Sequence, residues 1–287
     1  MRVRSCQLMA ARQSLADAAF WAGGTPRALQ LSIRIERLVF QMPVPLAVFS
    51  ADAPHLPPLL LLHPRDAPLA LALPAALAHF QRCASPPPPQ GAAASLTHRG
   101  RTLSLTTAVG VILDLSALST SAPPLPLRLD VRFSEAASED ENVAGAVSEA
   151  RSALFTRLKE ASVLACSSAA PAQNLPREAN EDIWSGLGDA ERAARGQAAV
   201  RRAVAAAGRS WREVRVPVRL YQVQGESIST SSHAAPASST LSAALHLPPS
   251  AKVVVAGITP PAGATLELLH RRLASSDFCL HVCVLLS

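Results

Sequence analysis

The chain has 287 residues, 49% of them hydrophobic, which is enough for one large domain or two to three small ones with real cores. Its formal net charge is +6, but the arginines are scattered, and only 4% of the residues are aromatic. This composition argues against a base-stacking nucleic-acid platform. It leaves open the alternative of a basic protein that docks on nucleic acid or an anionic membrane.

The cysteines and the apolar runs indicate the compartment. Five cysteines are spread over the whole length, an odd number that does not resemble a disulfide framework and favours a reducing compartment. No apolar run reaches the roughly 18 residues that span a bilayer, so we expect a soluble protein. We expect residues 1–37 to be a lead-in, partly disordered or helical, with an organelle transit peptide as the alternative.

The next segment begins with a predicted hairpin and a predicted helix. Residues 38–50 form two short apolar runs around prolines, a pattern typical of a β-hairpin with proline at its turn. Residues 59–62 are too short and too continuous to classify. The run from Leu69 to Phe80 predicts a helix that begins at Pro74, where a missing N–H costs least.

A second hairpin follows, centred on Arg99 and Gly100, because glycine supplies the positive φ of a tight turn. Residues 109–115 predict a short buried helix, and the strict alternation over 127–133 predicts a strand with one buried face. Hairpin, helix, hairpin, short helix and strand is the order of a β-grasp module. We therefore predict a first ubiquitin-like module over 38–134.

An acidic linker, 135–145, separates this module from a helix-rich region, 146–209. A helical apolar stripe in that region consists of Leu154, Leu158, Ala161 and Ala165. Further on, Asn180 is predicted to cap one helix and Asp189 a second, which a Glu191 to Arg195 pair supports and Gly208 ends. We interpret Trp184 as a core anchor between helices.

Residues 210–287 show a shorter strand and helix pattern, which we predict to be a second ubiquitin-like module. No strand pattern is visible in the Ser-rich stretch 225–240, which we predict to be a loop. The other predicted elements are a strand over 211–224, a short helix within 241–247, a strand over 252–258, a helix over 266–273 and a closing strand over 278–286.

No residue pattern predicts an active site. Cys279, His281 and Cys283 share one face of a predicted strand, where three ligands diverge instead of closing a tetrahedron around a metal. Cys83 and His79 flank a Pro-rich loop without an orienting third group, so they do not indicate a thiol nucleophile. We therefore expect no catalytic residues, no metal and no cofactor, and hence a protein that is not an enzyme.

Lys159 is unusual because the chain uses arginine almost everywhere else. Of the 27 basic residues, only Lys159 and Lys252 are lysines. An ammonium group can lose its proton and become a nucleophile, which a guanidinium does not do. Lys159 lies beside the apolar stripe, so its amine can reach water. It is either an ordinary solvated lysine or a chemically used one, whereas we interpret Lys252 as solvated.

The order of these elements and several short motifs resemble the autophagy protein 5 family, from about Leu38 to Leu286. The similar segments are Pro64-Arg65 with the helix ending at Phe80, Gly110-Val-Ile-Leu-Asp-Leu115, Leu158-Lys159-Glu160-Ala161, Asp182-Ile183-Trp184, Arg215-Val-Pro-Val-Arg-Leu-Tyr221, Gly257-Ile258 and Phe278-Cys-Leu-His-Val282. The resemblance implies an α+β fold with two ubiquitin-like modules flanking a helix-rich middle.

The resemblance also implies a function. Lys159 would be the isopeptide acceptor for the carboxy-terminal glycine of the ubiquitin-like autophagy protein 12. The conjugate, with the coiled-coil autophagy protein 16 bound as a helix in a groove, would act like a ligase that lipidates autophagy protein 8 during autophagosome formation. The implied place is the cytoplasm and the membrane of the phagophore assembly site, with peripheral membrane association, conjugating enzymes as further partners and no specific nucleic acid.

Overall fold

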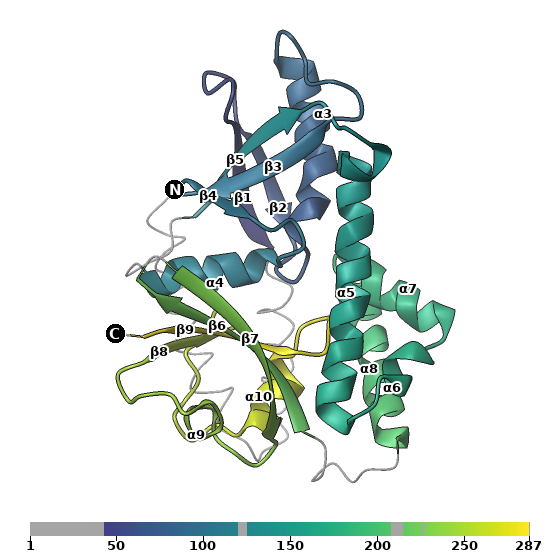
Figure 1. The fold of residues 1–287 in the computed structure, drawn as a ribbon, viewed down its shortest axis with the longest axis vertical. Coiled ribbons are helices and arrows are strands. Elements are labelled where there is room, and N and C mark those ends of the chain that lie inside the picture. Colours follow the sequence, from purple (N-terminus) through teal and green to yellow (C-terminus); the bar gives the residue numbers. More distant parts are fainter. Residues whose placement is uncertain (1–42, 120–124, 208–214, 226, 287) are drawn as a thin grey trace.

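The computed structural model of the protein describes residues 43–119, 125–207, 215–225 and 227–286. Two β-sheets lie one above the other, and the long helix α5 (Val143–Cys166) runs alongside both (Figure 1). This is a mixed α and β architecture, as the sequence predicts. The predicted lead-in over 1–37 lies outside the described residues. Among the described residues, no helix combines the length and the hydropathy of a membrane span.

The first sheet is mixed, with strand order β2-β1-β5-β3-β4. Its strands are β1 (Val44–Ser50), β2 (Leu59–His63), β3 (Ala93–His98), β4 (Arg101–Leu103) and β5 (Leu127–Ser134). β1 and β5 are parallel, and the other neighbours are antiparallel. The 3-10 turn η1 (Leu69–Ala72) and helix α3 (Leu73–Cys83) bury Leu73 and Phe80 in the core that this sheet shares.

The second sheet has the order β7-β6-β9-β8. Its strands and helices are β6 (Arg215–Gln224), β7 (Ser227–Pro236), α9 (Leu241–Leu245), β8 (Lys252–Val255), α10 (Leu266–Leu273) and β9 (Leu280–Leu285). β6 is parallel to β9, as β1 is to β5. In both sheets a hairpin therefore places its first strand beside the last strand of the unit.

The predicted hairpin within 38–50 is wrong, although its first residues lie outside the described part of the chain. Val44–Ser50 is a single strand, and its hairpin partner is β2, which the sequence left unclassified. Pro45 can lie inside this strand because the pairing of β1 with β5 begins only at the next residue, Leu46. In the same way, the pairing of β6 with β9 begins only at Val218, the residue after Pro217. On the side that faces β5 or β9, the missing N–H of each proline therefore removes no sheet hydrogen bond.

The Ser-rich stretch is also different from its prediction as a loop. Residues 227–236 form β7, which pairs with β6 over ten residues. β7 is an edge strand, and most of its side chains are exposed. Because few of its side chains are buried, the sequence of β7 shows no alternation of apolar and polar residues. That alternation is the signal from which a strand is predicted.

Other predicted elements are confirmed, some with new bounds. The second hairpin turns at Arg99 and Gly100, whose φ angles are 51° and 77°. β5 shows the predicted alternation, and α10 covers 266–273 as expected. Helix α4 (Val109–Ser119) continues beyond the predicted 115.

The helical region contains α5, α6 (Ala170–Gln173), α7 (Arg177–Ser185) and α8 (Ala190–Ala206). Asp189 caps α8, since its carboxylate accepts hydrogen bonds from the N–H groups of Glu191 and Arg192. The predicted cap at Asn180 is wrong, because α7 already begins after Pro176. Gly208, the predicted end of α8, lies outside the described residues.

The Glu191 to Arg195 pair is also not the one that forms. Arg195 donates two hydrogen bonds to Asp182 of α7, at 3.0 and 3.1 Å, and so ties α8 to the preceding helix. This ion pair lowers the pKa of Asp182. Helical spacing predicts a pair between Glu191 and Arg195, four residues apart. The packing of α7 on α8 instead brings Asp182 close enough to accept both hydrogen bonds of Arg195.

Helix α4 joins the two sheets. It lies between them in Figure 1, and its Val111 and Leu118 pack with Cys283 of β9. The Arg65 guanidinium forms a buried ion pair with Asp114 of α4, and the other oxygen of Asp114 accepts a hydrogen bond from the Gly257 N–H at 3.2 Å. One carboxylate therefore connects the loop after β2, α4 and the loop after β8.

Gly110 gives Arg65 the room it needs. A Cβ atom at Gly110 would lie 2.4 Å from Arg65 Cγ and 3.0 Å from the Arg65 carbonyl oxygen. Gly110→Ala should therefore lower the free energy of unfolding by about 1 to 3 kcal/mol, although alanine favours a helix. Urea denaturation measures this. Gly188→Ala is the matched control, because a Cβ there meets nothing within 4 Å; equal effects of the two substitutions would contradict the prediction.

Candidate functional site

Lys159 lies on the exposed side of α5, while the opposite side of the helix is buried. The predicted apolar stripe is confirmed, since Leu154, Leu158, Ala161 and Ala165 are all buried. The exposed residues in line with Lys159 are Ser152, Thr156 and Val163. They are small or uncharged, so neither bulk nor charge on this side of the helix shields the amine.

The amine of Lys159 has no acidic partner on its own helix. The positions three and four residues away, where helical side chains meet, hold Phe155, Thr156, Ser162 and Val163. Within the described part of the chain, no ion pair or hydrogen bond of the Lys159 side chain is found. The adjacent acid, Glu160, binds Arg219 of β6 instead, at 2.5 Å.

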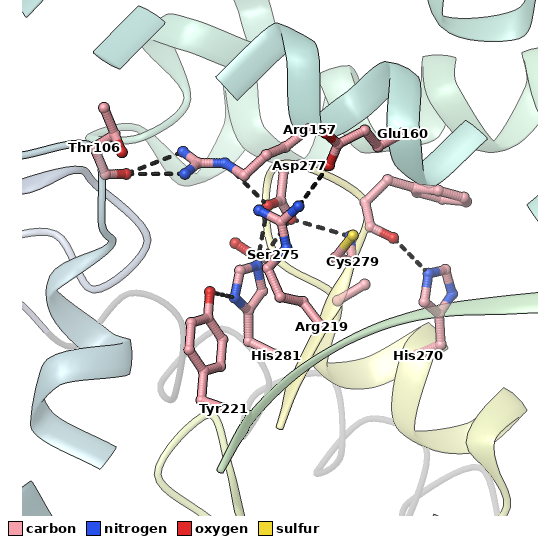
Figure 2. A network of polar contacts seen from close by, with 12 residues as sticks. Thr106, Arg157, Glu160, Arg219, Tyr221, His270, Ser275, Asp277, Cys279 and His281 are labelled. Carbon is pink, nitrogen blue, oxygen red and sulfur yellow. Dashed lines mark hydrogen bonds and ion pairs between the residues drawn. The ribbon is translucent and has the colours of Figure 1, made fainter. Parts of the chain in front are cut away.

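A second arginine fixes the same turn of α5. Both terminal nitrogens of Arg157 donate to the carbonyl oxygen of Thr106 at 3.1 Å, and its Nε lies 3.6 Å from Asp277 Oδ2. Figure 2 shows Arg157, Glu160 and Arg219 gathered around Asp277 below the helix. The turn that carries Lys159 is therefore attached to the first sheet's connections through Thr106 and to the second sheet through Arg219.

Asp277 is the buried anion of this network. It lies in the turn before β9 and contacts His281 Nε2 at 3.0 Å, while His281 Nδ1 lies 3.0 Å from the Tyr221 hydroxyl (Figure 2). Nε2 donates to the carboxylate, and Nδ1 shares a second hydrogen bond with the tyrosine hydroxyl. Burial raises the pKa of Asp277, but the positive charges of His281 and Arg157 and the hydrogen bonds outweigh it and lower the pKa to about 2.

The other members of the network are held in fixed states. Burial and the negative charge of Asp277 raise the pKa of Tyr221, so the phenol stays protonated at neutral pH. Burial also raises the pKa of the Cys279 thiol well above its usual value. Neither group is therefore set up as a nucleophile near pH 7.

The sequence candidates for chemistry have other partners in the fold. His281 binds Asp277 and Tyr221, whereas Cys283 is buried against α4 with Val111. Cys83 is exposed at the end of α3, and His79 contacts the Pro57 carbonyl oxygen at 2.9 Å. Over the residues that the structure describes, no group of three or more His, Cys, Asp or Glu could hold a metal ion.

Two further sequence interpretations concern Trp184 and Lys252. Trp184 is partly buried and packs against the core between α5, α7 and α8, and the Arg151 guanidinium lies 5.7 Å from its ring centroid. This agrees with the predicted core anchor. Lys252 is exposed at the start of β8, as expected of a solvated lysine.

Sequence reasoning missed the residues that hold Lys159 in place. Arg157, Arg219 and Asp277 come from α5, β6 and the turn before β9, so no local spacing connects them. The available signal was weak: Arg219 occupies a strand position that alternates with apolar residues, which the sequence presents as a solvated arginine.

A partly buried carboxyl group, Asp66, lies beside this network. It lines a cavity of about 20 Å³ together with Arg65, Asp114, Ser275 and His281. Burial raises the pKa of Asp66 to about 6, and the negative charge of Asp277 adds to the increase, whereas His281 and Arg65 oppose it. The protonated form is therefore the one that the fold favours.

Asp66→Asn should stabilise the protein at high pH. The folded pKa of about 6 lies above the unfolded 3.8, so the ionised carboxylate destabilises the fold above pH 6, and this cost fades as the pH falls toward 4. The gain in unfolding free energy should be about 1 to 2 kcal/mol larger at pH 8 than at pH 4. Urea denaturation at both pH values measures it, with the exposed Asp52→Asn as the charge control. A gain independent of pH would contradict the prediction.

Comparisons with known proteins identify the fold. No family model matches the sequence, and no curated protein sequence matches it. The crystal structure of Kluyveromyces marxianus Atg5 superposes on this chain with a TM-score of 0.68 and 15% sequence identity. The match covers 88% of this chain and 99% of that chain. This chain therefore has the fold of autophagy protein 5, as the resemblance in its sequence implied.

Proposed function

We propose that this protein is a non-catalytic scaffold of the autophagy conjugation machinery and that Lys159 is its isopeptide acceptor. The observation that carries the proposal is the exposed Lys159 amine, without an ion-pair partner in the described residues, on the central helix of a fold shared with autophagy protein 5. The shared fold supports an autophagy-related role, and the exposed lysine supports the covalent step.

The reaction requires little from this chain. The neutral Lys159 Nζ attacks the thioester carbonyl of the carboxy-terminal glycine of autophagy protein 12, carried on a conjugating enzyme. The C–N bond forms, the C–S bond breaks, the thiolate leaves on the enzyme, and the proton of the amine passes to solvent or to a base of that enzyme. Asp277, His281 and Tyr221 bind one another beneath the helix, so they are not placed to act as that base.

We assign the two sheets to two ubiquitin-like modules, over 38–134 and 210–287. A linker, 135–145, and a helix-rich region, 146–209, separate them; α5 already begins at Val143. The support is the shared topology, in which the first strand of each sheet forms a hairpin and lies parallel to the last strand. α4, between the sheets, would hold the modules as one unit.

The partners follow from the same assignment. Autophagy protein 16 would bind as a helix in a groove of the modules. The conjugate would then act like a ligase in the transfer of autophagy protein 8 to phosphatidylethanolamine, in the cytoplasm and at the membrane of the phagophore assembly site. Binding of a protein helix is a packing interaction, so it should depend weakly on salt, unlike binding of a basic protein to nucleic acid.

Lys159→Arg tests the acceptor. When the chain is incubated with autophagy protein 12 and its activating and conjugating enzymes, the larger covalent species should form with the wild type and be absent with the variant, because a guanidinium stays protonated. Denaturing gel electrophoresis and mass spectrometry of the junction peptide measure this.

The chain offers a matched control, because Lys252 is its only other lysine. Lys252→Arg should conjugate like the wild type. Conjugation of Lys159→Arg at the wild-type level would show that Lys159 is not the acceptor.

A further inference from the structure

Glu160 is the acidic side chain beside Lys159 in the sequence. The acidic residues of α5 are Glu149 and Glu160, and Glu149 is ten residues away, nearly three turns along the helix. Adjacent side chains on a helix do not face each other as those three and four residues apart do, but both of these side chains are long and flexible. A carboxylate released at position 160 would bring its negative charge nearer the ammonium and so favour the charged amine, which cannot attack a carbonyl carbon.

Arg219 binds the Glu160 carboxylate and holds it away from the amine. Its side chain is 14% exposed, and its NH2 atom lies 2.5 Å from Glu160 Oε2, which is itself on a side chain 50% exposed. Arg219 is on β6, which is paired on both sides by β7 and β9, so its backbone is fixed. Figure 2 shows the Glu160 side chain pointing down from α5 toward the Arg219 guanidinium. The carboxylate is therefore drawn toward the sheet.

We propose that Arg219 is a positioning residue for Lys159, because by holding Glu160 against β6 it keeps the negative charge of the neighbouring carboxylate away from the acceptor amine. The inference rests on the proposed acceptor role of Lys159. It adds that the availability of the amine depends on a residue of the second sheet, 60 positions further along the chain.

Three variants separate this role from a purely structural one. Arg219→Met removes the charge and retains an apolar stem, so Glu160 is released, and conjugate formation should slow about two- to fivefold, as expected for a partly exposed ion pair. Glu160→Gln should conjugate at close to the wild-type rate, because no carboxylate remains to pair with the amine. The double variant should recover the rate of Glu160→Gln.

The opposite pattern would overturn the proposal. If the ion pair only docks α5 on the sheet, Glu160→Gln should be as slow as Arg219→Met, and the double variant should be no faster. Should Arg219→Met fail to fold, Glu160→Asp replaces it, because aspartate retains the charge but loses one methylene of reach toward Arg219. Glu160→Asp should then be slower than Glu160→Gln.

A second readout does not need the conjugating enzymes. Reductive methylation with ¹³C-formaldehyde labels two lysines, Lys159 and Lys252, besides the amino terminus. In Arg219→Met the NMR chemical shift of the Lys159 methyl signal should change at constant pH, and in the double variant it should return toward its wild-type value, while the Lys252 signal stays constant. An unmoved Lys159 signal in Arg219→Met would overturn the proposal. If the wild type forms no conjugate, the acceptor role fails, and the NMR comparison alone decides whether Arg219 restrains Glu160.

Discussion

The buried ion pair between Arg65 and Asp114 is the contact on which the arrangement of the molecule depends. It brings the loop after β2 against α4, and the second oxygen of Asp114 reaches the loop after β8 through the Gly257 N–H. Loss of the guanidinium would leave a buried carboxylate without its counter-charge, a change that costs about 3 to 5 kcal/mol. This carboxylate, with the glycines that make room around the arginine, therefore fixes the relative position of the two sheets together with the packing of α4 on β9.

Helix α5 uses this fixed arrangement to present one amine. Its inner side packs into the core between α5, α7 and α8, and Arg157 and Glu160 attach the same turn to groups from both sheets. The amine of Lys159 is left on the outer side. The acceptor role that we propose needs such a division of tasks: the enzyme that carries the thioester would supply the chemistry, and this chain would supply a lysine that is accessible and held in a constant place.

The charged groups beneath the helix stabilise the molecule rather than react. Asp277 is kept ionised by His281 and Arg157, whereas Asp66, the residue after Arg65, has its pKa raised to about 6 by burial. Two carboxyl groups in one region thus differ because one has cationic neighbours in contact and the other is desolvated with weaker compensation. The network is a structural junction with a pH-dependent member.

The sequence by itself determined those elements whose pattern is local. The alternation in 127–133, the glycine turn at 99–100, the apolar stripe of α5 and the cap at Asp189 all depend on residues a few positions apart, and the structure has them. It singled out Lys159 because lysine is rare in this chain. Only the tertiary structure decided that the Ser-rich stretch is an edge strand, that Arg195 binds Asp182, and that Arg219 holds Glu160. Those features join residues from separate elements, and a partner that packing brings close leaves no periodic signal in the sequence.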